Sequence, residues 1–230
     1  DEGNSGEEGG GVPGRWGEGR NGVSAAIGAP KSNLIGRSWG AYLAARHLLE
    51  TPDSPAISAT MISPLFSTKI WIADAKHRLS ELGEGRLTEV EICEHEHHFD
   101  GYRYREIMAE YDANFRYRLK TVERPGHMST PLKPKSGSGM NVYHYMWGPS
   151  EFTCDGVLKD LDITDAVRGI RIAVLFICGE FDQVRQPTCE YYRSLIPGSR
   201  MAIIPDASQT SYLEQPNIFY WTLRHFYECF

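Results

Sequence analysis

The stretch Gly36-Arg37-Ser38-Trp39-Gly40 decides the fold class that this sequence predicts. It has the form G-x-S-x-G, with an apolar pair at 34–35 before it and an Ala- and Leu-rich run at 41–49 after it. This pattern is typical of a sharp strand-to-helix turn, in which glycines allow the backbone to bend and to pack closely. Such a turn would hold the Ser38 hydroxyl out of regular structure. It would also aim the backbone N–H of Trp39 at a developing oxyanion.

The bulk composition is that of a chain large enough to bury a core. Of 230 residues, 41% are hydrophobic and 23% charged, with a net charge of −6 that disfavours nucleic acid as a partner. No apolar run approaches the length of a membrane span. The five cysteines are scattered without a C-x-x-C pair, which favours reduced thiols and hence a cytoplasmic protein.

Alternating strand and helix patterns flank a long helical region. Before it, the sequence predicts a strand at 33–35, a helix at 41–50 and a buried strand at 56–63. After it come a strand at 170–178 (IRIAVLFIC), a helix at 187–196, a strand at 201–204 and a last helix at 216–230. Strands that alternate with helices predict an α/β fold with a parallel sheet. Residues 1–22 are rich in glycine and poor in apolar side chains, so we expect a disordered tail.

Residues 65–146 have apolar side chains at helical spacing and predict an inserted helical cap over one end of the sheet. Within it lies the run Cys93-Glu94-His95-Glu96-His97-His98, whose side chains are metal ligands in other contexts. Adjacent residues do not converge on one helix face, however, and no H-E-x-x-H spacing occurs. We therefore interpret the run as a solvated helix end, and we expect neither a metal nor a cofactor.

Several motifs together resemble the proline iminopeptidases, serine aminopeptidases that remove N-terminal proline from peptides. The motifs are the elbow at 36–40, the cap segment at 71–76, MWGPSEF at 146–152, the segment at 158–165 and CGEFD at 178–182. They occur in the family's order. The resemblance implies an α/β-hydrolase fold whose core is formed by 23–64 and 147–230, with 65–146 as the cap.

The resemblance also implies roles for particular residues. Ser38 matches the nucleophile and Asp182, just after a predicted strand, matches the acid that orients the base. Trp39 would supply one oxyanion N–H. Glu151 matches an acidic residue that holds the free α-amino group of a peptide, a task for which a desolvated carboxylate is well suited.

The sequence departs from the family in three respects. Gln209 stands where the family has its catalytic histidine, and an amide cannot accept the proton of the serine. Gln183 stands where a second amine-binding glutamate is usual. The glycine-rich oxyanion loop and the strands before the elbow are not found, so we expect only one backbone donor and an exposed sheet edge through which the chain could self-associate.

Four other histidines are candidate substitutes for the missing base: His47, His127, His144 and His225. None follows a strand at the sheet's active edge, and His127 in its loop is the least implausible. Three functions stay open. The first is a prolyl aminopeptidase acting on peptides with a free N-terminus, weak or inactive because Gln209 stands at the position of the base. The second is a catalytically dead binding protein of hydrolase fold, and the third an esterase, which MWGPSEF argues against.

Overall fold

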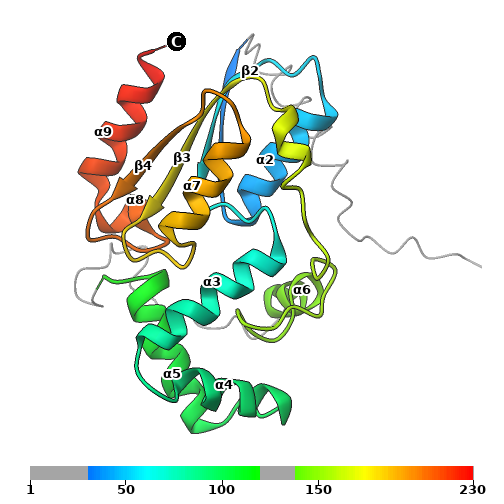
Figure 1. The fold of residues 1–230 in the computed structure, drawn as a ribbon, viewed down its shortest axis with the longest axis vertical. Helices are drawn as coiled ribbons and strands as arrows, with labels where there is room; N and C mark the ends of the chain where they lie inside the picture. The colour runs from blue at the N-terminus through cyan, green and yellow to red at the C-terminus, as the bar shows by residue number, and fades with distance from the viewer. Residues whose placement is uncertain (1–30, 120–137, 230) are drawn as a thin grey trace, which may run out of the picture.

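A computed structural model describes residues 31–119 and 138–229. Its centre is a parallel sheet of four strands in the order β1-β2-β3-β4 (Figure 1). The strands are β1 (Ser32–Arg37), β2 (Ala56–Ile62), β3 (Ala173–Gly179) and β4 (Arg200–Ile204). The predicted α/β fold with a parallel sheet is therefore confirmed. The tail at 1–22 and His127 lie outside the described residues.

The two faces of the sheet are covered by different helices (Figure 1). Val174, Phe176 and Cys178 of β3 pack in one core with α2 (Trp39–Glu50) and α7 (Gln186–Leu195). Leu175 and Ile177 pack on the opposite face with α9 (Pro216–Tyr227). Since successive side chains of a strand point to opposite faces, a strand buried on both faces is apolar throughout, which is why β3 was evident in the sequence.

Strand β3 begins three residues later than its sequence pattern predicts. A short 3₁₀ helix, η4 (Ala166–Gly169), precedes it, and Ile170 at the end of that turn is buried in the same core as α2. The apolar run therefore includes a core residue that lies outside the strand. Two further short elements, the helix α8 (Ser211–Glu214) and η4 itself, had no clear sequence signal.

The described part of the region predicted as a cap consists of helices joined by turns. It contains α3 (Thr68–Glu81), α4 (Arg86–His95), α5 (Tyr102–Tyr111), the π-helical turn η1 (Asp112–Arg116) and α6 (Ser138–Met146). These elements gather beyond the end of the sheet toward which the strands point (Figure 1). Helices α3, α4 and α5 share a core of their own around Leu79, Val90 and Ile107. The exact limits of core and cap stay a prediction.

No helix in the described ranges combines the length and the apolar character needed to cross a bilayer.

Candidate functional site

Ser38 occupies a sharp turn between β1 and α2, as the G-x-S-x-G pattern predicts. Its backbone has φ 53° and ψ −121°, a conformation that is uncommon for any residue with a side chain. Its N–H donates to the carbonyl of Ile62 over 2.9 Å, and its carbonyl accepts from the N–H of Ala41 over 3.0 Å. The side chain makes no helix-capping hydrogen bond. Backbone hydrogen bonds thus hold the turn that carries Ser38 at the carboxyl end of the sheet.

The two glycines of the elbow have different reasons. A Cβ on Gly36 would lie 2.3 Å from the carbonyl oxygen of Gly40 and 2.7 Å from the Cα of Ala41, so only glycine lets α2 start this close to β1. A Cβ on Gly40 would meet nothing within 4 Å. The close packing that the sequence predicts for this turn therefore depends on Gly36. Trp39 is the first residue of α2, which puts its backbone N–H at the amino end of that helix.

Asp182 is fully buried in the loop that follows β3. Its carboxylate accepts from the Ser63 hydroxyl over 2.6 Å and from the backbone N–H groups of Gly179 and Val184 over 3.1 and 3.0 Å. Burial raises the pKa of Asp182 to about 6, while these hydrogen bonds and the charge of Arg78 lower it in part. The carboxylate is therefore rigidly oriented but costly to ionise.

Ser63 connects this acid to the serine elbow. It follows Ile62, the residue that accepts the Ser38 N–H, and it has φ 44° at the end of β2. The ends of β1, β2 and β3 thus meet at one edge of the sheet, where parallel strands gather functional groups. The sequence does not indicate this short chain of contacts, because nothing in the AISATMIS pattern distinguishes Ser63 from the other serine, Ser58.

Gln209 lies in the loop after β4 and is 5% exposed. This loop packs directly on the Asp182 loop: Phe181 N–H donates to the Ala207 carbonyl over 2.8 Å, and a Cβ on Gly179 would lie 2.3 Å from the same oxygen. The candidate residues Ser38, Asp182 and Gln209 therefore come from three loops at the same sheet edge. Within the described part of the chain they share no hydrogen bond with one another.

Glu151 lies where the cap meets the core, with a side chain that is 12% exposed. Its carboxylate accepts from Trp71 Nε1 over 3.2 Å, from Tyr143 OH over 2.9 Å and from Gln183 Nε2 over 3.1 Å. Arg116 of η1 completes the surroundings with an ion pair of 3.3 Å. Burial raises the pKa of Glu151, but the Arg116 charge and these three hydrogen bonds outweigh it and hold the pKa below its usual value.

Gln183 and Glu151 form a pair whose chemistry differs from that of two glutamates. Two carboxylates at this distance would need a cation between them, whereas an amide donates directly to Glu151. The side chain of Gln183 is fully buried, and its Oε1 has no hydrogen-bond partner among the described residues. A buried amide oxygen without a partner is costly.

The acidic and histidine-rich run at 93–98 spans the end of α4, and one of its residues, Glu94, has a structural role. Glu94 accepts hydroxyl protons from Tyr104, Ser150 and Thr153, so it anchors the turn that carries Glu151. Nothing in the local spacing indicated this role, because two of the three donors lie more than 50 residues away. In the portion of the chain that is described, no group of three or more His, Cys, Asp or Glu side chains is arranged to hold a metal ion.

Of the candidate substitute bases in the described residues, two contact other side chains and one is exposed. His47 on α2 lies 2.9 Å from the Ser54 hydroxyl, and His225 on α9 stacks on Trp221. His144 is exposed on α6.

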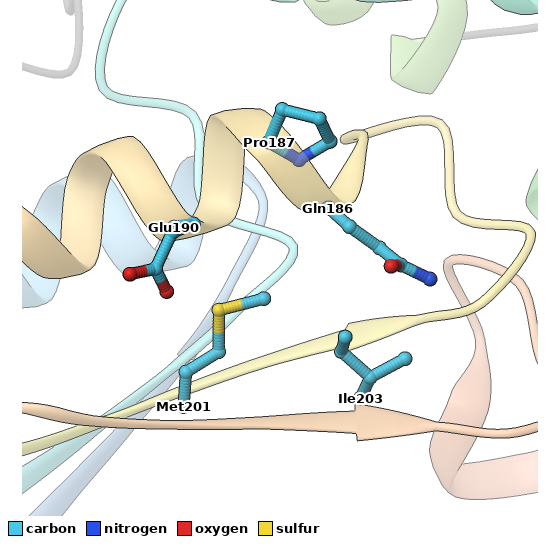
Figure 2. A pocket seen from close by; sticks show the side chains of 5 residues that line it. All are labelled: Gln186, Pro187, Glu190, Met201 and Ile203. Carbon is cyan, nitrogen blue, oxygen red and sulfur yellow. The ribbon is translucent and has the colours of Figure 1, made fainter.

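A separate groove of about 470 Å³ lies between α7 and β4 (Figure 2). Its lining contains none of the candidate site residues; it consists of Gln186, Pro187, Glu190, Met201 and Ile203.

Proline iminopeptidases are among the proteins to which this chain is similar. No protein-family model matches the chain. A curated proline iminopeptidase of Heyndrickxia coagulans is 31% identical over 194 residues, which cover 84% of this chain and 66% of that protein. One of Lactobacillus delbrueckii subsp. bulgaricus is 22% identical over 84% of this chain and 64% of its own length. The chain thus spans slightly less than two thirds of these relatives.

Solved structures share the fold. A crystal structure of proline iminopeptidase from Mycobacterium smegmatis superimposes with a TM-score of 0.83 at 23% identity, covering 94% of this chain and 72% of that one. An esterase from Exiguobacterium antarcticum superimposes with a TM-score of 0.57 at 16% identity, covering 93% of this chain and 73% of that one. The sequence relatives and the shared architecture together show that this chain belongs to the proline iminopeptidase family of α/β-hydrolases.

Proposed function

We propose that this chain carries the site of a serine hydrolase that releases N-terminal proline from peptides, and that its turnover is weak or absent because Gln209 replaces the base. The observation that carries the proposal is the strained Ser38 elbow, joined through Ile62 and Ser63 to the buried carboxylate of Asp182. A non-glycine residue with positive φ is stabilised only where the surrounding structure demands it, and such residues cluster at active sites.

The chemistry explains why position 209 decides the rate. When the Ser38 oxygen bonds to the carbonyl carbon, its proton must move to a base, and the same proton must later reach the departing nitrogen. An imidazole does both, whereas a carboxamide such as that of Gln209 is neither basic nor acidic enough at neutral pH. The Trp39 N–H would stabilise the oxyanion, and such stabilisation alone supports only residual catalysis.

We further propose that Glu151 holds the ammonium of the substrate's N-terminus. Its carboxylate is ionised, largely buried and surrounded by cap and core side chains, as an ammonium site requires. Arg116 already compensates its charge, so an incoming ammonium would compete with the guanidinium. We therefore expect weak binding of the peptide amine.

A second candidate function is a catalytically dead protein of hydrolase fold that binds small ligands in the cap. The observation that favours it is that Gln209 is buried without bonding to Ser38 or Asp182, within the described residues. The core and cap limits, peptides as partners, self-association at the β1 edge and a cytoplasmic location remain proposals of the same kind.

The decisive experiment restores the base. A fluorophosphonate probe and a proline arylamide are applied to the unmodified chain, to Gln209→His, and to Gln209→His combined with Ser38→Ala. We expect Gln209→His to raise arylamide turnover at least ~100-fold, the range that general-base catalysis supplies. The variant that also carries Ser38→Ala should be inert. Robust turnover by the unmodified chain would contradict the weak-activity proposal. Faster turnover of an acyl ester than of the proline arylamide would favour the esterase.

No labelling or turnover in Gln209→His, with the fold intact by circular dichroism, would contradict the hydrolase site. Binding of proline amide to the unmodified chain, lost in Glu151→Gln, would in that case favour the binding protein. Arg116→Met tests the competition separately. It should strengthen binding of proline amide, because the carboxylate of Glu151 would then have no other cation beside it.

A further inference from the structure

Glu214 is the last residue of α8 and accepts hydrogen bonds from both sides of the loop that carries Gln209. Ser208 donates to it with its backbone N–H and, over 2.6 Å, with its hydroxyl. The Thr210 hydroxyl lies 2.8 Å from Oε1. The carboxylate thus holds the residues immediately before and after Gln209, so it fixes the backbone on which the side chain at 209 is carried.

The same carboxylate reaches the cap. The backbone N–H of Arg118, which follows η1, donates to Oε1 over 2.7 Å. Two other bonds run beside it: Gln209 N–H donates to the Phe115 carbonyl over 3.2 Å, and the Thr210 hydroxyl lies 2.9 Å from the Arg116 carbonyl. Since Thr210 has one hydroxyl proton, it can donate either to Glu214 or to the Arg116 carbonyl, but not to both at once.

Segment 115–118 also contacts the other parts of the candidate site. The Arg118 guanidinium lies 3.9 Å from the centre of the Phe181 ring, beside Asp182, and Arg116 pairs with Glu151. The Glu214 carboxylate takes donors from two segments 90 residues apart, with the Arg118 N–H and two hydroxyl groups at Oε1 and the Ser208 N–H at Oε2. Figure 1 shows α8 at the end of β4, on the side of the sheet where the cap helices lie.

We propose that Glu214 is the positioning residue for the loop that carries position 209, and that it fixes this loop relative to the cap through Arg118. It does not touch the reacting atoms. Its catalytic consequence rests on the proposed function, whereas its effect on the two segments does not. Without the carboxylate, the amides of Ser208 and Arg118 lose their acceptor together, although no covalent segment joins them locally.

Amide hydrogen exchange on the full chain tests the positioning role. In Glu214→Ala, we expect the amides of Ser208 and Arg118 to exchange at least ~10-fold faster, while the amides of β3 are unchanged. In Glu214→Gln, one of the two amides should keep its protection, because the amide retains one oxygen and turns an NH₂ group toward the other donor. Glu190→Ala, which removes an exposed acid paired with Arg193, is the matched control.

Two results would overturn the proposal. One is exchange of both amides within twofold of the unmodified rate in Glu214→Ala. The other is an equal acceleration throughout β3, which would mean that Glu214 contributes only to global stability.

Labelling kinetics in the Gln209→His background test the catalytic consequence separately from the positioning of the loop. We expect Glu214→Ala to lower the rate constant at saturating fluorophosphonate at least ~10-fold, with the half-saturating concentration within twofold. Glu190→Ala should change neither. An unchanged rate constant would overturn the catalytic part of the proposal. If Gln209→His alone is not labelled, the proposed function fails, and the exchange data still decide whether Glu214 positions the loop.

Discussion

The backbone conformation and its hydrogen bonds position Ser38, whereas side-chain contacts position Asp182 and Glu151. Its positive φ places the hydroxyl outside both β1 and α2, and two backbone hydrogen bonds, to Ile62 and from Ala41, fix the turn. Such a conformation costs on the order of 1–3 kcal/mol and persists because the neighbouring elements are packed around it. The close approach at Gly36 is part of that packing.

Gly36→Ala should therefore destabilise the chain by about 3 kcal/mol, because its Cβ would overlap backbone atoms that cannot move aside. Gly40→Ala is the matched control within the same turn. Its Cβ would meet nothing, so the free energy of unfolding should stay within about 1 kcal/mol of the starting value. Urea unfolding of both variants measures this, and equal effects would contradict the explanation.

Asp182 combines complete burial with a chain of three donors, and burial has the larger effect on its pKa. Because the folded pKa of about 6 exceeds the ordinary value of 3.8, the folded chain retains a proton that the unfolded chain releases. The stability that this proton provides is present below the unfolded pKa and is lost as the pH rises through about 6.

Asp182→Asn should remove this pH dependence. Between pH 4 and 7 we expect the unmodified chain to lose up to about 3 kcal/mol more stability than the variant, as follows from the size of the pKa change. Chemical unfolding at several pH values gives the difference curve, in which other titrating groups such as Asp74 cancel. A flat curve would show that Asp182 ionises in the folded chain as readily as in water.

At the scale of elements, α4 anchors the segment that holds Glu151. Its residue Glu94 accepts hydrogen bonds from three hydroxyl groups, two of which belong to the turn at Ser150 and Thr153. The neighbouring acid Glu91 faces outward, is 49% exposed and pairs with Lys76. One helix thus carries a structural acid and a solvated acid three residues apart.

Glu94→Ala should destabilise the chain by about 2–3 kcal/mol, because it leaves partly buried hydroxyl groups without their acceptor. It should also accelerate amide exchange at 150–153. Glu91→Ala should change the free energy of unfolding by less than about 1 kcal/mol, as exposed ion pairs contribute little. If the two substitutions cost the same, Glu94 does not anchor the turn.

At the scale of the whole molecule, α3 attaches the cap helices to the sheet. Arg78 donates from Nε to the Asp182 carbonyl over 2.8 Å and from Nη2 to the Glu180 carbonyl over 3.1 Å. On the same helix, Asp74 accepts the N–H of Arg185 over 3.0 Å, just before α7. The planar guanidinium suits two carbonyls at once, which the ammonium of a lysine does not.

Arg78→Lys should therefore cost about 2 kcal/mol and loosen the loop at 180–182 relative to α3. Arg103→Lys is the control, since Arg103 bridges Glu89 and Glu106 on the exposed side of the cap. Thermal unfolding and amide exchange at 180–182 measure the two effects. Equal and small effects would mean that the two Arg78 hydrogen bonds do not hold the loop at 180–182 against α3.

The sequence by itself determined the features that depend on local order. Alternation of strand and helix patterns predicted the parallel sheet, G-x-S-x-G predicted the elbow, and the apolar run of β3 put Asp182 at a strand end. These are consequences of backbone geometry and of burial within one segment, so a short window of residues contains the information.

Only the tertiary structure decided which side chains meet. Glu151 is surrounded by Trp71, Arg116 and Gln183, and Glu214 joins Ser208 to Arg118, across separations of up to 96 residues. Residue types alone left Glu94 a solvated acid and gave Glu214 no role. A buried carboxylate takes the donors that the packing of the cap on the sheet brings within reach, and that packing is a property of the whole chain.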